Sequence, residues 1–191
     1  MIARRFALAV TLAAAAMTVP ALAQAAPVKP ARALLDQFEF PPGSIGHVAG
    51  NASPRVGDGE SNAPRCAALS RDLDRRLSSV TSAEARAGIG GTALLVYILD
   101  RPLSGPIAGT VLTCGAQYLG PKPVADTAIP SDLRGRNPAV VRTGTTDLQA
   151  WVDVRGVTVS VNVISTDRTP VDRNLVWRLL RDQIAKVEKQ P

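Results

Sequence analysis

The chain has 191 residues, of which 46% are hydrophobic and 20% charged, and this composition is typical of a globular protein of about one domain. Its 22 basic and 16 acidic residues give a formal net charge of +6, which favours anionic surroundings without indicating a fold. Aromatic residues make up only 4% of the chain. This argues against a nucleic-acid partner, because single-strand binding surfaces stack bases on several aromatic rings.

Residues 1–25 have the three parts of a secretory signal peptide. Arg4 and Arg5 precede an apolar run over residues 6–19, and small-residue cleavage patterns end at Ala23 and Ala25. The run is shorter than the roughly 20 residues that span a bilayer, and no later segment is long and uncharged enough to do so. We therefore expect a secreted chain, cleaved near Ala23 or Ala25, with no transmembrane segment in its mature form.

Residues 26–62 are rich in proline, glycine, alanine, serine and asparagine, which predicts an extended, loop-rich segment. It contains the one histidine of the chain, His47, between glycines. We interpret His47 as a surface residue without a role. The apolar side chains that look suited to burial here are Leu34, Leu35, Phe38 and Phe40.

Residues 63–191 predict a single α+β domain that begins with a helix. Pro64 suits the first turn, since its missing N–H needs no partner there. Apolar residues then recur at steps of three and four, as on one face of an amphipathic helix. Cys66 heads this buried stripe, which continues through Leu69, Leu73, Leu77 and Val80.

Two apolar runs after this helix are interpreted as strands. Residues 92–99 (TALLVYIL) have the length of a buried central strand, and residues 108–119 (AGTVLTCGAQYL) predict a second strand that carries Cys114. Prolines and charges then indicate a long loop over residues 120–137, followed by a short strand at 139–142.

The clearest structural signal lies between residues 148 and 165. If Arg155-Gly156 is a two-residue hairpin loop, the apolar residues of the two strands face one another on one side of the hairpin. The pairs are Val154 with Val157, Val152 with Val159, Ala150 with Val161 and Leu148 with Val163.

The other side of this hairpin is polar apart from one tryptophan. Its members are Gln149, Trp151, Asp153, Thr158, Ser160 and Asn162. A large ring among hydrogen-bonding groups is a common binding surface, so these six residues are the candidate ligand-binding site. The alternative is that a loop, such as residues 120–137, folds over Trp151 and buries it.

The chain ends in a second amphipathic helix. We expect Thr169 as its N-cap, Pro170 in its first turn and Asp172 near the positive end of the helix dipole. Its apolar face comprises Val171, Leu175, Val176, Leu179, Leu180, Ile184 and Val187. These elements predict an antiparallel sheet with an N-terminal and a C-terminal helix packed mainly on one face.

Cys66 and Cys114 are the two cysteines of the chain, and an exported protein more often pairs two cysteines than keeps them as thiols. A metal site would need paired ligands such as C-x-x-C, and a thiol nucleophile would need a neighbouring base, for which only His47 is available. Serine-nucleophile and calcium-loop motifs are missing as well. We therefore expect a disulfide, no metal, no cofactor and no enzymatic activity.

Two short motifs, Phe40–Gly43 (FPPG) and Pro64–Leu69 (P-x-C-A-A-L), and the order of the elements resemble mycobacterial exported proteins and lipoproteins over about residues 35–190. Some of those proteins look like the extracytoplasmic sensor domain of a receptor-type serine/threonine kinase. That resemblance implies a sheet with helices around a ligand cleft. The kinase sensor has two disulfides, whereas this chain has cysteines for one.

The sequence thus predicts a secreted, non-catalytic, sensor-like domain of the cell envelope. Its expected partner is a small ligand, an envelope component or another protein. Two alternatives stay open. The first is an exported hydrolase whose acidic or serine site is assembled only in space, and the second is a structural or inhibitor-type envelope protein.

Overall fold

A computed structural model describes residues 26–54, 63–119 and 121–191, so the predicted signal peptide (residues 1–25) lies outside the described residues. Within this part of the chain, no helix is long and apolar enough to cross a membrane. The elements, in chain order, are α1 (Pro30–Ala33), β1 (Ile45–Ala52), α2 (Pro64–Leu77), β2 (Ser82–Ile89), β3 (Thr92–Leu99), α3 (Ser104–Cys114), α4 (Ala116–Leu119), β4 (Pro123–Ala125), α5 (Ser131–Arg134), β5 (Ala139–Thr143), β6 (Asp147–Val154), β7 (Val157–Ser165) and α6 (Arg173–Glu188).

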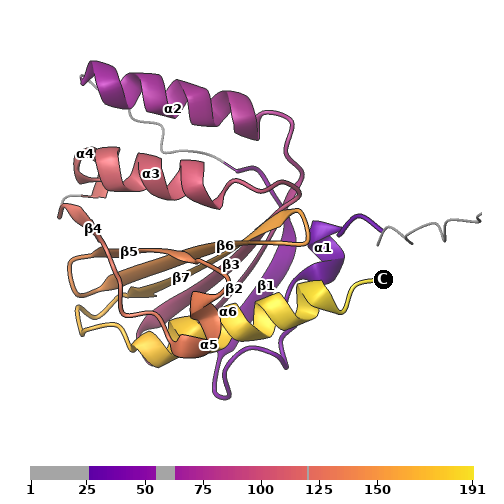
Figure 1. Ribbon diagram of the computed structural model, residues 1–191. Coiled ribbons are helices and arrows are strands. Elements are labelled where there is room, and N and C mark those ends of the chain that lie inside the picture. Colours follow the sequence, from indigo (N-terminus) through magenta and orange to yellow (C-terminus); the bar gives the residue numbers. More distant parts are fainter. Residues whose placement is uncertain (1–25, 55–62, 120) are drawn as a thin grey trace, which may run out of the picture.

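The strands form one antiparallel sheet in the order β1-β2-β3-β7-β6-β5-β4. The α+β class, the antiparallel sheet and both terminal helices are as predicted. The placement of the helices differs, because α2 and α3 lie over one face of the sheet while α1, α5 and α6 lie on the other (Figure 1). Both faces therefore need apolar or fully hydrogen-bonded side chains where a helix covers them.

The main core lies between the sheet and α6. The hairpin register is confirmed, since Val154 faces Val157 and every apolar pair up to Leu148 and Val163 occurs as predicted. Arg155 and Gly156 both have positive φ, at 50° and 80°, as a tight two-residue hairpin loop requires. The valines of β6 and β7 pack against buried α6 residues, among them Val176, Leu179, Leu180, Ile184 and Val187.

Residues 108–119, predicted as a strand, instead supply most of α3 and all of α4. The apolar positions that pack near Trp151 are Ile107, Ala108, Val111 and Leu112, and this spacing is helical. A window that begins at residue 108 hides this period, because Val, Leu and Thr then look like a short strand. The predicted loop at 120–137 also contains β4 and α5.

The segment 26–62, predicted as loop-rich, contributes α1, β1 and part of the main core. Leu34, Leu35 and Phe40 are buried as expected, whereas Phe38 is 87% exposed. The fully buried Gln183 of α6 holds this segment in place, because its amide oxygen accepts from Leu35 N at 3.1 Å and its Nε2 donates to Ala33 O. The N-terminal region is therefore docked on α6 through paired polar groups as well as apolar contacts.

The C-terminal helix begins later than predicted. Its N-cap is Asp172, whose Oδ1 accepts from Asn174 N at 2.9 Å, and not Thr169. Thr169 instead belongs to the preceding turn, where its N and Oγ1 both donate to Asp167 Oδ1. A carboxylate at the cap also suits the positive end of the helix dipole.

Candidate functional site

The six predicted site residues do project from one face of the sheet, because the β6/β7 register sets Trp151 opposite Ser160, Gln149 opposite Asn162 and Asp153 opposite Thr158. This face is the one that α3 covers (Figure 1). Three of the six residues are buried under the covering helix, two are half-buried and one is exposed: the buried ones are Trp151, Thr158 and Ser160, the half-buried ones Gln149 and Asn162, and the exposed one Asp153.

Trp151 belongs to the buried group, at 4% exposure. It packs in a cluster with Ala108 of α3 and Val141 of β5, and Ile107 and Val111 border that cluster. The sequence left burial of Trp151 under a loop such as 120–137 as the alternative to ligand contact. The ring is buried, but the element that covers it is α3. The side chain stabilises the packing of α3 on the sheet, and its face is closed to a ligand from solvent.

Asp153 and Thr158 hold the start of α3, whose own N-cap residue, Leu103, makes no capping bond with its side chain. Ser104 N donates to Asp153 Oδ1 at 3.1 Å, and Ser104 Oγ donates to Asp153 Oδ2 at 2.7 Å. Leu103 N donates to Thr158 Oγ1 at 2.6 Å, and Thr158 Oγ1 lies 2.6 Å from Asp153 Oδ1. Two strand residues thus cap a helix that is distant in the sequence.

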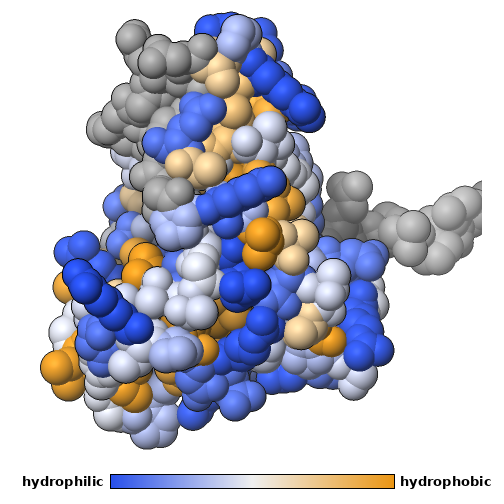
Figure 2. Space-filling view, turned by 90° about the vertical axis from the view of Figure 1, so that its left-hand side faces the viewer, coloured by the Kyte–Doolittle hydropathy of each residue, from blue (hydrophilic) through white to orange (hydrophobic). Residues whose placement is uncertain are grey.

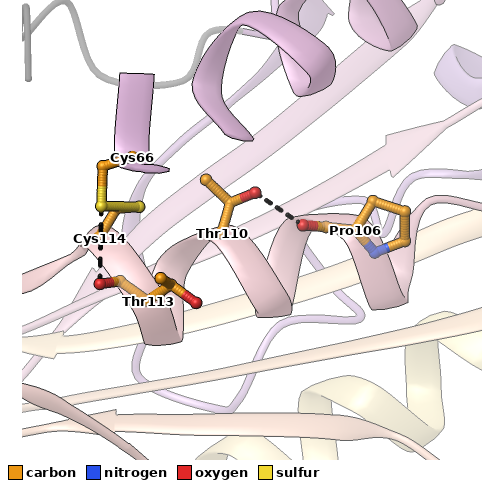
Figure 3. The surroundings of a disulfide bond; sticks show 5 residues. All are labelled: Cys66, Pro106, Thr110, Thr113 and Cys114. Atoms are coloured by element: carbon orange, nitrogen blue, oxygen red, sulfur yellow. Dashed lines mark hydrogen bonds between the residues drawn. A yellow bond between two sulfur atoms is a disulfide. The ribbon is translucent and has the colours of Figure 1, made fainter. Parts of the chain in front are cut away.

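The predicted disulfide is present, and it joins α2 to α3 instead of joining a helix to a strand. Cys66 and Cys114 have a Cα–Cα distance of 5.4 Å, and both residues are buried. Figure 3 shows the bridge at the C-terminal end of α3, where Cys66 Sγ lies 3.7 Å from Thr113 O. Together with a small apolar cluster that includes Leu73, Leu77, Leu99 and Leu103, the bridge fixes α2 on top of α3.

The half-buried group lies on the same face, toward the start of β6. Gln149 and Asn162 are partly exposed, and the neighbouring residues Asp147 and Thr143 extend the group across β5 and β6. We call these four residues, Thr143, Asp147, Gln149 and Asn162, the polar strip. Thr143 and Asp147 are directly opposite each other, as are Gln149 and Asn162, so all four side chains project from the same face.

The polar strip is short of hydrogen-bond donors. Gln149 Nε2 donates to both oxygens of the Asp147 carboxylate, at 3.0 and 3.3 Å. Burial raises the pKa of Asp147, and this bond from Gln149 offsets only part of the rise. Asn162 Oδ1 and Thr143 Oγ1 are buried and have no hydrogen-bond partner among the described residues. The whole Thr143 residue is only 6% exposed. Each such group costs desolvation free energy. Three further oxygens of this kind in the described residues, Ser44 Oγ, Ser70 Oγ and Asp100 Oδ1, lie outside the polar strip.

The sequence named Gln149 and Asn162 but missed Thr143 and Asp147. The strand alternation that identified Gln149, Trp151 and Asp153 also includes residue 147, and the strand at 139–143 extends the same face by one more row.

On the side of this face toward β2, Tyr97 opposes Ser160 and Glu84 opposes Tyr97. Burial is the larger cause and the negative charge of Glu84 the smaller one that together raise the pKa of Tyr97 to about 12, so its hydroxyl stays protonated and can donate a hydrogen bond.

His47 lies in β1 and packs edge-on against Phe40, with ring centroids 5.2 Å apart. Its Nε2 is 3.4 Å from Leu35 O.

Within the described ranges, no group of three or more His, Cys, Asp or Glu side chains is arranged to hold a metal ion. On the face that Figure 2 shows, hydrophobic residues are interspersed with hydrophilic ones.

Comparisons of the chain with protein families, with curated proteins and with solved structures found no match. A function is therefore inferred from the geometry of the site and from the residues that form it.

Proposed function

We propose that this chain is an exported, non-catalytic domain of the cell envelope that binds a small polar ligand at the polar strip. The observation that carries the proposal is the pair of buried, unpartnered oxygens, Asn162 Oδ1 and Thr143 Oγ1, on either side of a desolvated carboxylate. A ligand that donates hydrogen bonds would satisfy groups that the protein itself leaves unpaired.

The spacing of the strip supports a ligand larger than a single functional group. Thr143 is on β5 and Asn162 on β7, with β6 between them. Neighbouring strands are about 4.8 Å apart, so the strands that carry Thr143 and Asn162 are separated by roughly 10 Å across the sheet. That span and the mixture of amide, carboxylate and hydroxyl groups suit a polyhydroxylated ligand about two sugar rings long. An envelope glycan is our candidate class.

The export of the domain is supported by the signal-peptide pattern at residues 1–25 and by the Cys66–Cys114 disulfide, which is compatible with an oxidising compartment outside the cytoplasm. The resemblance to envelope sensor domains supports the same placement.

The test is a titration of the mature, isotopically labelled protein with three disaccharides, namely lactose, trehalose and N,N′-diacetylchitobiose, followed by backbone amide NMR shifts. We expect at least one of them to shift the resonances of residues 143, 147, 149 and 162 in a saturable manner. Asn162→Ala should weaken that binding, and Asn174→Ala, an exposed asparagine on α6, is the matched control that should leave it unchanged. If all three sugars leave the strip unshifted, or if Asn162→Ala binds as the parent does, the proposal is wrong.

A further inference from the structure

The two edges of the sheet differ in a way that points to a second binding surface. One edge is β4, which has only three residues, begins with Pro123 and follows Lys122. A short strand with a proline and a nearby lysine is a common protection against unwanted strand pairing. The other edge is β1, which has eight residues, IGHVAGNA, without a charged residue or a proline.

Exposed apolar side chains gather at the β1 edge. Four large hydrophobic residues are exposed in the described part of the chain, and two of them are in β1: Ile45 at 75% and Val48 at 53%. A third, Phe38, is in the turn that leads to β1, and the fourth, Val124 at 39%, is in β4. This concentration is unusual for a strand edge that faces only water.

The outer backbone of β1 is also open. In an antiparallel strand pair, alternate residues direct their N–H and C=O groups away from the partner strand. Among the described residues, no backbone–backbone hydrogen bond outside the strand ladders involves residues 45–52, while Ser82 Oγ of β2 donates to Ala52 O at 2.7 Å. A Cβ atom built on Gly50 would meet no atom within 4 Å, so the face of the sheet is uncovered at this residue and a side chain there would be exposed.

We propose that β1 is a dimer interface, at which β1 of a second copy of this chain pairs antiparallel to it about a two-fold axis. A two-fold axis brings each β1 side chain against β1 side chains of the other copy. Because β1 contains no Lys, Arg, Asp or Glu, no pair of these charges meets across this axis, even though the chain as a whole is basic. Residues 48–52, which follow the irregular register between Ile45 and Val48, are the regular stretch that pairs. The two sheets then form one continuous sheet, and Val48 becomes buried.

The first test measures the mass of the mature protein by sedimentation velocity over a wide concentration range. We expect a concentration-dependent species of twice the monomer mass. Val48→Lys should lower the dimer affinity by about tenfold or more, because it places charge in the new strand pair. Val124→Lys makes the same change on the opposite edge and should leave the affinity unchanged. If the protein is a monomer at every concentration, the proposal is wrong. It is wrong also if β1 then proves to bind a strand of a different protein.

The second test locates the axis. Both native cysteines are in the disulfide, so a single new cysteine reports contact between copies. Gly50→Cys should form a covalent dimer under mild oxidation, while Val124→Cys, the matched control, should remain monomeric. If both variants cross-link equally, or if only Val124→Cys does, the interface is not at β1. Neither test involves the polar strip, so failure here is distinguishable from failure of the proposed function.

Discussion

Removal of the Asp153 carboxylate tests whether the sheet face holds α3 in place. In Asp153→Ala, Ser104 loses the acceptor for both its N–H and its hydroxyl, and Thr158 loses a partner at 2.6 Å. Loss of a helix N-cap costs about 0.5–2 kcal/mol, and hydrogen bonds to a charged group contribute about 1.5–3 kcal/mol. Since Asp153 is exposed, the lower part of these ranges applies, and we expect the free energy of unfolding to fall by about 1.5 kcal/mol.

Urea denaturation measures this loss, and the m-value should stay constant, because the surface exposed on unfolding does not change. Asp153→Asn keeps one acceptor oxygen and should lose about half as much. Amide hydrogen exchange at Leu103 and Ser104 should accelerate more than exchange in α6. A free energy of unfolding within about 0.3 kcal/mol of the parent would refute the capping role of Asp153.

Three further predictions follow from the other polar and covalent contacts. Replacement of Cys66 and Cys114 by serine should lower the free energy of unfolding by about 4 kcal/mol on the chain-entropy model for a separation of 48 residues, and thermal denaturation with and without reductant measures this. The hydrogen bond from Arg173 holds the pKa of Asp126 below 3.8, so Asp126→Asn should lower the free energy of unfolding by about 2 kcal/mol at pH 7. This difference from the parent should vanish as the pH falls through the pKa of Asp126 in the folded protein, and a difference that persists in acid would contradict the ion pair. Burial raises the pKa of Asp147, so the ionised carboxylate destabilises the fold. Asp147→Asn should therefore have a higher free energy of unfolding than the parent at pH 7, and the two proteins should become equally stable below about pH 3.8, where Asp147 is protonated in both the folded and the unfolded parent. Chemical denaturation at several pH values measures this.

The hairpin and its register followed from the sequence, because the alternation of valines excludes a one-residue slip and the two-residue loop at Arg155-Gly156 selects one of the remaining registers. The disulfide pairing was equally constrained, since the chain has two cysteines. The strand β2 was missed because its core positions are the small alanines 83, 85 and 87, which have low strand propensity and give a weak hydrophobic signal.

The candidate site was predicted only in part. The sequence pattern indicated that its side chains share one face but not which helix would cover that face, because the packing of α3 on Trp151 depends on contacts between residues 39 to 44 positions apart. It also gave no sign that Asp153 and Thr158 would cap that helix. The unpartnered state of Asn162 Oδ1 and Thr143 Oγ1 is a property of the folded environment alone.

If Asn162 Oδ1 and Thr143 Oγ1 are left unpaired for a ligand, they destabilise the ligand-free protein, and its free energy of unfolding measures this. Thr143→Val and Asn162→Leu keep the shape of each side chain and remove the unpaired group. We expect the double variant to have a free energy of unfolding about 1–2 kcal/mol higher than the parent, because two buried unsatisfied groups are gone. A double variant that is less stable than the parent by about 1 kcal/mol or more would show that the two oxygens are not both unpaired in the folded protein, and the polar strip would then not be a site built for a ligand.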